Sequence, residues 1–95
     1  MNMPILGATD FEILVLAREP VSAKHIDNPL VSARIPARPD TYPARMTLSD
    51  NDVEWLVIAI DGKLYGWPRV VFEQLVDDDK VRIFRNGKEV DLGAL

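Results

Sequence analysis

The fold is decided by residues 53–67, which read VEWLVIAIDGKLYGW. Residues 53–60 are apolar and rich in β-branched side chains, which is typical of a buried central strand. The dipeptide Asp61-Gly62 that follows favours a type I′ turn between two antiparallel strands. A two-residue turn makes residues 63–67 the return strand. The implied cross-strand pairs are Ile60–Lys63, Ile58–Tyr65 and Leu56–Trp67.

A helix is predicted directly after this hairpin, at about 68–77. Pro68 suits the first position of a helix because that position needs no N–H donor. The charges at the two ends oppose the helix dipole, since Arg69 is near the positive end and the acidic run 77–79 is near the negative end. We therefore expect the acidic run to form a turn just beyond the helix. The apolar stripe consists of Val71, Phe72, Leu75 and Val76.

A second hairpin is predicted at about 80–92, because Asn86-Gly87 is another strong type I′ signal. Its register gives one wholly apolar face and places an opposite-charge pair on the other face. A slip of one residue would destroy both patterns. The implied pairs are Ile83–Val90, Val81–Leu92, Phe84–Glu89 and Arg82–Asp91.

The N-terminal half is less regular. Residues 11–18 favour a strand over a short buried helix because a proline ends the run, and residues 30–35 indicate a second strand. Residues 36–50 contain three prolines and predict an extended loop. The expected fold class is therefore α+β, with a small, mostly antiparallel sheet of five or six short strands and one helix. Residues 1–95 are expected to form a single domain.

Composition narrows the function classes. The chain has 95 residues and no cysteine, which excludes disulfides and thiolate chemistry. The net charge is −4, and the whole deficit lies in residues 48–95, which hold ten acids and six bases. Nucleic acid is a poor partner for such a chain, whereas a basic protein surface is a suitable one. No apolar run is long enough to span a membrane, and the first residues do not resemble a signal peptide.

The sequence contains no strong candidate for a catalytic, metal-binding or phosphate-binding site. His25 is the only histidine, and Asp27 alone cannot complete a zinc or iron site with it. Residues 50–54 are rich in oxygen ligands, but the sixth position of this run is Trp55, where a calcium loop needs glycine. No nucleophile elbow or phosphate-binding glycine loop is present. We therefore expect no cofactor, no metal and no catalytic residue.

The residues best suited to a protein interface are aromatic, arginine and exposed acidic ones. Trp67 lies at a strand-to-helix corner, where both a core position and an exposed anchor remain open. The proline-rich loop is either a contact arm or a solvated connection. The candidate interface residues are Arg38, Tyr42, Arg45, Trp67, Asp77, Asp78 and Asp79.

The segment from Trp55 to Tyr65, with Val71-Phe72-Glu73 after it, resembles small proteins of tailed phages and prophages. Those chains carry a Trp-Ile-Val pattern, then Gly-Glu and Tyr-Pro, then a helix with Phe-Glu. This chain differs in having Gly66 after the tyrosine and in extending past the helix as the second hairpin. The resemblance implies a phage or prophage origin and assigns no catalytic residue.

These observations favour a non-catalytic module that docks on a basic protein surface, as a phage accessory factor or an inhibitor of a bacterial system would. Such a protein would act in the cytoplasm of the bacterial host. The alternatives are a self-assembling, virion-type structural subunit, an enzyme or ligand binder whose site assembles only in three dimensions, and a mimic of nucleic acid. Partners would be another protein or copies of the chain itself, and neither nucleic acid nor a membrane is expected.

Overall fold

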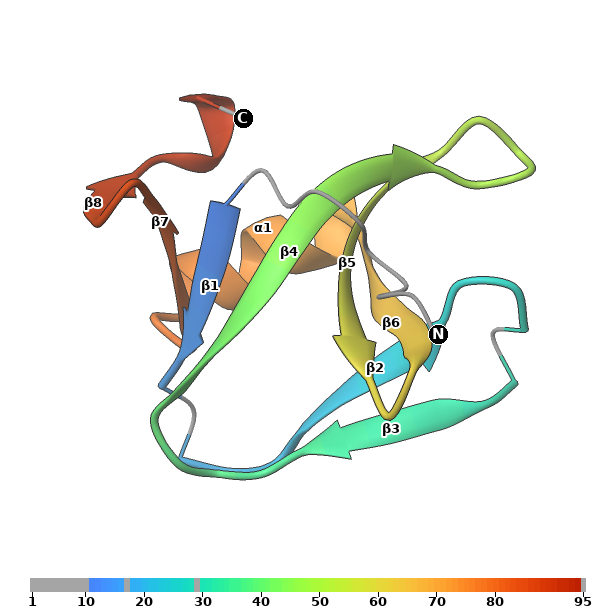
Figure 1. Cartoon of the computed structure of the whole chain (residues 1–95), viewed down its shortest axis with the longest axis horizontal. Coiled ribbons are helices and arrows are strands. Elements are labelled where there is room, and N and C mark those ends of the chain that lie inside the picture. The colour runs from blue at the N-terminus through green and yellow to red at the C-terminus, as the bar shows by residue number, and fades with distance from the viewer. Residues whose placement is uncertain (1–10, 17, 29, 95) are drawn as a thin grey trace.

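The computed structural model describes residues 11–16, 18–28 and 30–94, and in them eight antiparallel strands form one sheet beside one α-helix (Figure 1). The strand order is β3-β2-β6-β5-β4-β1-β7-β8. The expectation of five or six strands is therefore wrong. The elements are β1 (Phe11–Val15), β2 (Val21–His25), β3 (Ser32–Ile35), β4 (Asp40–Leu48), β5 (Glu54–Ile60), β6 (Lys63–Pro68), α1 (Arg69–Asp77), β7 (Val81–Arg85), β8 (Lys88–Val90) and a short 3-10 turn η1 (Leu92–Ala94).

The first four strands form one long, bent antiparallel ribbon. β1 pairs with β4, with Val15 opposite Asp40, and β2 pairs with β3, with Val21 opposite Ile35. The register shifts by only one residue between the two halves. Three prolines (Pro20, Pro36 and Pro39) lie where the halves meet, and proline interrupts a ladder because it has no N–H.

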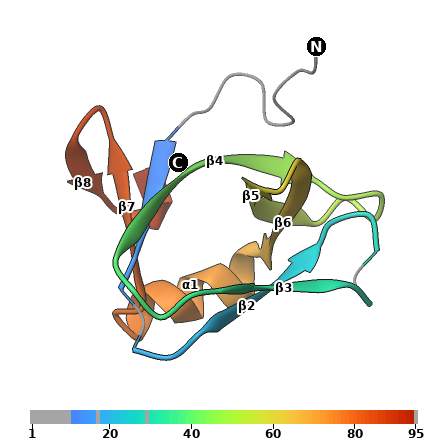
Figure 2. The ribbon, with the colours of Figure 1, turned by 60° about the horizontal axis from the view of Figure 1, so that its bottom comes forward.

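The bend folds the sheet round on itself. One half of the ribbon pairs with β5 through β4, and the other half pairs with β6 through β2. The strands therefore surround the interior in a closed outline, although the hydrogen-bonded order ends at β3 and β8 (Figure 2). Helix α1 follows β6 and packs against β5, β6 and β7.

The predicted loop over residues 36–50 is wrong. Residues 40–48 form β4, the longest strand, and only 36–39 connect it to β3. Pro43 is tolerated because β4 has only β1 beside it at this residue, since β5 begins to pair at Ala44. Alternation along β4 sends Tyr42, Ala44 and Met46 to the core.

The apolar side chains lie on two faces of the sheet. The main core is on the inner face, where Phe72 of α1 is completely buried between the strands. A smaller cluster of Trp55 and Val57 lies on the outer face, with Ile26 and Leu64 packed against it. Residues 55–58 are all buried because both faces of β5 are covered, which explains why this strand reads as a continuous apolar run.

Both hairpin turns are confirmed. Asp61-Gly62 and Asn86-Gly87 have positive φ at both positions, as a type I′ turn requires. The β5–β6 register has the three predicted pairs. The second hairpin has the predicted Ile83–Val90 and Phe84–Glu89 pairs but is shorter than expected, because β8 ends at Val90. The outer pairs Val81–Leu92 and Arg82–Asp91 do not form, because Leu92 turns into the core in η1. On its other edge, β7 pairs with β1, with Val81 opposite Val15 and Arg82 opposite Leu14.

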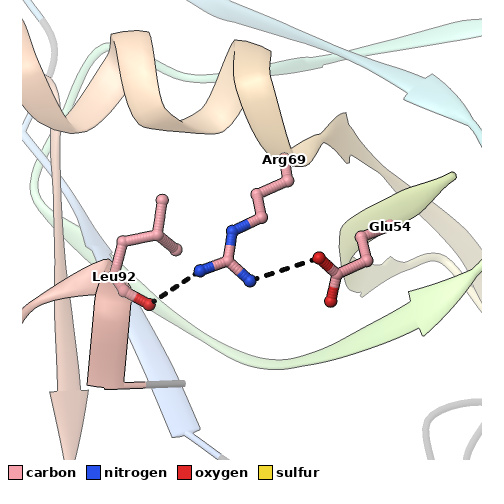
Figure 3. A network of polar contacts seen from close by, with 3 residues as sticks. All are labelled: Glu54, Arg69 and Leu92. Atoms are coloured by element: carbon pink, nitrogen blue, oxygen red, sulfur yellow. Dashed lines mark hydrogen bonds and ion pairs between the residues drawn. The ribbon is translucent and has the colours of Figure 1, made fainter.

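Helix α1 begins at Arg69, with Pro68 as the residue before it. Arg69 opposes the helix dipole, but its guanidinium is used elsewhere (Figure 3). It donates to Oε1 of Glu54 and to the carbonyl oxygen of Leu92, each at 3.3 Å. Arg69 therefore ties the start of the helix to β5 and to the C-terminal turn.

Candidate functional site

A groove of about 750 Å³ lies between the bend of the ribbon, helix α1 and the start of β7. Its volume is within the range of about 300–1,000 Å³ that ligand pockets occupy. Its walls come from two segments that are distant in sequence, residues 16–22 and residues 67–82. They are lined by Leu16, Arg18, Glu19, Pro20, Val21, Ser22, Trp67, Val71, Leu75, Asp78, Asp79, Lys80 and Arg82.

The groove is lined by both apolar and charged side chains, and its apolar part centres on Trp67. Trp67 is 3% exposed and packs against Phe72, with ring centroids 5.7 Å apart. Val71 is 45% exposed and Leu75 is partly buried, because the helical stripe is wider than the core that it covers. An apolar surface left open beside buried aromatic side chains is the kind of feature that a partner covers.

A hydrogen bond at Trp67 marks the place where two strands separate. β2 pairs with β6 only at Lys24 and His25, and β6 turns away beyond Gly66. The indole Nε1 of Trp67 donates to the carbonyl oxygen of Ser22 at 2.8 Å and so replaces a bond of the ladder. The groove occupies the space that this separation opens.

The acidic residues lie at the C-terminal end of α1, all of them exposed. Asp77 is the last helical residue, and Asp78 and Asp79 form the turn that the sequence predicts beyond the helix. The N–H of Asp79 donates to the carbonyl oxygen of Val76, and that of Lys80 donates to Leu75. This is a Schellman motif, whose left-handed position is usually glycine.

Here Asp79 takes that left-handed position, with φ of 62°. A residue with a Cβ is strained in this conformation, although aspartate tolerates it better than most. Its carboxylate is also unfavourable at the negative end of the helix dipole, and the last turn contains no basic residue. An exposed ion pair with Arg82, at 4.0 Å, offsets part of this cost. Asp79 is therefore unfavourable for the stability of the fold in two ways, through its backbone conformation and through its charge.

The remaining predicted residues lie away from the groove. Arg38 is exposed in the β3–β4 connection. Tyr42 faces the core from β4, whereas Arg45, opposite Val57, is on the other face of the same strand. The Nε atom of Arg45 is buried without a hydrogen-bond partner in the described part of the chain. The structure therefore places these three residues outside the groove, and among the predicted residues it brings Trp67 together with Asp78 and Asp79.

Tyr42 has a shifted pKa. Burial raises the pKa of its phenol above 10.0, and the charge of Asp40 adds to this effect while Arg38 acts against it. The phenol is therefore held in its neutral form.

His25 and the oxygen-rich segment have structural roles. The ring of His25 meets Tyr65 edge to face at 5.3 Å, and its Nδ1 accepts the N–H of Asp27. Ser49 Oγ accepts from the N–H groups of Asn51 and Val53, so these residues form a turn before β5. Among residues 11–16, 18–28 and 30–94, no three acidic or histidine side chains are grouped closely enough to hold a metal ion.

Most of the groove could not be recognised in the sequence. Leu16, Val21 and Ser22 adjoin the helix only because the ribbon bends, and no local pattern reports that bend. One signal was present: Val71 and Leu75 belong to the same apolar stripe as the buried Phe72, and the stripe is broader than one packed face needs.

Comparisons with known proteins give no relative for this chain. No protein-family model matches the sequence, and neither the curated proteins nor the solved structures contain a match. In the described part of the chain, no helix has the length and apolar character needed to cross a membrane.

Proposed function

We propose that the chain is a non-catalytic protein-binding module that docks through the groove onto a basic segment of another protein. The observation that carries this proposal is the groove itself. Its apolar floor, formed by Trp67 with Val71 and Leu75, is open to the surface beside the carboxylates of Asp78 and Asp79. An apolar centre with a charged rim is the usual composition of a protein interface.

The conformation of Asp79 supports a role for its carboxylate. Glycine would relieve the strain at this position, and a neutral side chain would relieve the repulsion by the helix dipole. Residues that break a local rule are expected at functional sites, and the exposed ion pair with Arg82 compensates Asp79 only in part. A cationic group of a partner would supply the missing compensation.

The overall charge supports a basic partner. The chain has net charge −4, and α1 with its following turn carries Glu73 and the acidic run 77–79, all exposed. The rim also contains Arg18, Lys80 and Arg82, which balance the charges of Glu19, Asp78 and Asp79. The attraction to a basic segment would therefore come from the net charge of the whole chain rather than from the groove alone. Added salt would weaken it by screening.

The resemblance of the Trp55–Tyr65 segment to tailed-phage proteins supports a phage or prophage origin. An accessory factor or an inhibitor of a bacterial system would meet its target in the cytoplasm of the host, and we place the protein there within this proposal. Docking of this kind needs no cofactor.

Self-assembly through the edges of the sheet is the weaker alternative. The edge strands β3 and β8 have only four and three residues, and they present the charged side chains of Arg34 and Lys88. Short, charged edge strands resist pairing with another copy. Light scattering of the concentrated protein would support this alternative if it showed an oligomer.

The proposal is tested by capture from a bacterial lysate with the wild-type chain and two helix variants. Val71→Asp places a charge in the groove, whereas Val70→Asp changes an adjacent side chain that is 71% exposed and does not line the groove. We expect Val70→Asp to retain the captured protein and Val71→Asp to lose it. The captured protein should also dissociate at high salt. Equal capture by both variants would contradict docking through the groove.

A further inference from the structure

The edge of β2 that faces the groove is paired with no described strand at residues 21–23, although the Trp67 indole already occupies the carbonyl oxygen of Ser22. β2 pairs with β3 from Val21 to Lys24, but it pairs with β6 only at Lys24 and His25. No described strand therefore stands on the β6 side of residues 21–23. That side opens into the groove, which Val21 and Ser22 both line.

The hydrogen bonds of β2 show which backbone groups face this edge. The N–H of His25 donates to Val31 on the β3 side, at 2.9 Å, and the N–H of Ile26 donates to Leu64 on the β6 side, at 3.2 Å. Because successive residues of a strand present their backbone groups to opposite neighbours, Ser22 faces the same side as Ile26. The Trp67 indole, which reaches the carbonyl oxygen of Ser22 from this side, agrees with that direction.

We infer that the groove binds an extended peptide segment by strand addition to β2. This inference rests on the proposed function and specifies its partner. The segment would continue the line of β6 beyond Gly66, accept a hydrogen bond from the N–H of Ser22 and donate to the carbonyl oxygen of Pro20. Main-chain bonds of this kind provide affinity, and pockets for alternate side chains provide specificity.

The groove specifies the side chains of that segment. Alternate residues of a strand point to opposite faces, so one set faces the apolar floor of Trp67, Val71 and Leu75. Aliphatic side chains suit this floor. A basic residue near the end of the segment would lie close to the carboxylates of Asp78 and Asp79, which follow the C-terminal end of the same helix.

The test uses a short synthetic peptide in which valine and lysine alternate, and variants at Ser22. Ser22→Pro removes the N–H that faces the groove but leaves the bonds of β2 to β3, since proline is tolerated at a strand edge. Ser22→Ala is the matched control because it keeps the N–H. Binding is followed by the fluorescence of Trp67 in a Trp55→Phe background. We expect Ser22→Pro to weaken binding about tenfold, which is the loss of one main-chain hydrogen bond, and Ser22→Ala to weaken it much less, because it keeps the N–H.

The outcomes separate this inference from the proposed function. If Val71→Asp abolishes peptide binding and Ser22→Pro weakens it, strand addition in the groove is supported. If Val71→Asp abolishes binding but Ser22→Pro and Ser22→Ala bind equally, the groove remains a docking site and strand addition is overturned. No response of the wild-type chain to the peptide also overturns strand addition, and capture from the lysate then decides the proposed function independently. Protected exchange of the His25 amide verifies that Ser22→Pro retains the β2–β3 pairing.

Discussion

Trp67 and Ser22, 45 residues apart, are joined by a hydrogen bond of 2.8 Å from the indole nitrogen to the backbone carbonyl oxygen. This bond holds β2 near β6 at the point where the two strands separate. Replacing Trp67 by phenylalanine keeps an aromatic ring and removes the donor. We expect a loss of about 1–2 kcal/mol in the free energy of unfolding, measured by urea denaturation.

The same variant should also have a local effect. Lys24 is the first residue of β2 that pairs with β6, so its amide should exchange faster with solvent when Trp67 no longer holds the strand. Amides of β7 should be affected only through the global loss of stability. Uniform acceleration in both places, measured by NMR, would argue against a local role for this hydrogen bond.

Gly66 is needed because two backbones approach closely. It lies opposite Val57 in β5, and an added Cβ would overlap the carbonyl oxygen of Leu56. We expect Gly66→Ala to destabilise the fold by more than about 3 kcal/mol, because backbone atoms cannot move aside as a flexible side chain does. Gly93→Ala is the control, since nothing lies within 4 Å of its added Cβ. Similar unfolding midpoints for the two variants would show that β5 and β6 separate easily.

Asp79→Gly should make the protein more stable. Glycine removes the strain of the left-handed conformation and the repulsion by the helix dipole, for a gain of about 0.5–1 kcal/mol in the free energy of unfolding. Asp79→Asn removes the charge and keeps a residue that tolerates this conformation, so it isolates the electrostatic part. Both variants should bind the alternating valine–lysine peptide more weakly than the wild type does. Lower stability of Asp79→Gly in thermal unfolding would refute the Schellman assignment.

The pKa of Tyr42 predicts a loss of stability at high pH. Because the pKa is raised in the fold, the folded chain retains the phenolic proton at pH values where the unfolded chain has lost it. The contribution of Tyr42 is complete below the ordinary pKa of 10.0 and is lost as the pH rises through the folded-state value. Tyr42→Phe should remove this part of the pH dependence of unfolding.

A titration followed by NMR of the tyrosine ring would test the cause of that shift. Asp40→Asn should lower the pKa of Tyr42, whereas Arg38→Met should raise it, because the two charges act in opposite directions. A pKa that is unchanged by either substitution would leave burial as its sole cause.

The sequence predicts hairpins well where turn chemistry and alternation agree. Asp61-Gly62 and Asn86-Gly87 each fix a register locally, so their strands could be paired without knowledge of the rest of the fold. The prediction from sequence fails at β4. Its prolines indicate a loop, although Tyr42, Ala44 and Met46 alternate towards the core as in a strand. Whether a proline ends a strand depends on which neighbours that strand has, and those neighbours are set by tertiary structure.

The candidate site was predictable only in part. The acidic run at the helix end could be recognised from its conflict with the helix dipole, and Trp67 from its position at a corner. These residues line the same groove as Val21 and Ser22 only because the ribbon bends. The bend brings together segments that no short-range sequence pattern connects. Burial of Trp67 also changes its role, since it forms the floor of the groove and is not an exposed anchor.

The bent ribbon of β1–β4 has a consequence for exchange between molecules. Because the two halves of the ribbon, β1 with β4 and β2 with β3, belong to one continuous pair of segments, neither half can be handed to a neighbouring copy while the other half stays in place. Domain swapping, which requires a detachable element on a hinge, would have to unzip the pairs from Phe11–Ala44 to Lys24–Ser32 together. The ribbon therefore disfavours exchange of either of its halves between copies, and the groove-facing edge of β2 is where we propose that another polypeptide joins the sheet.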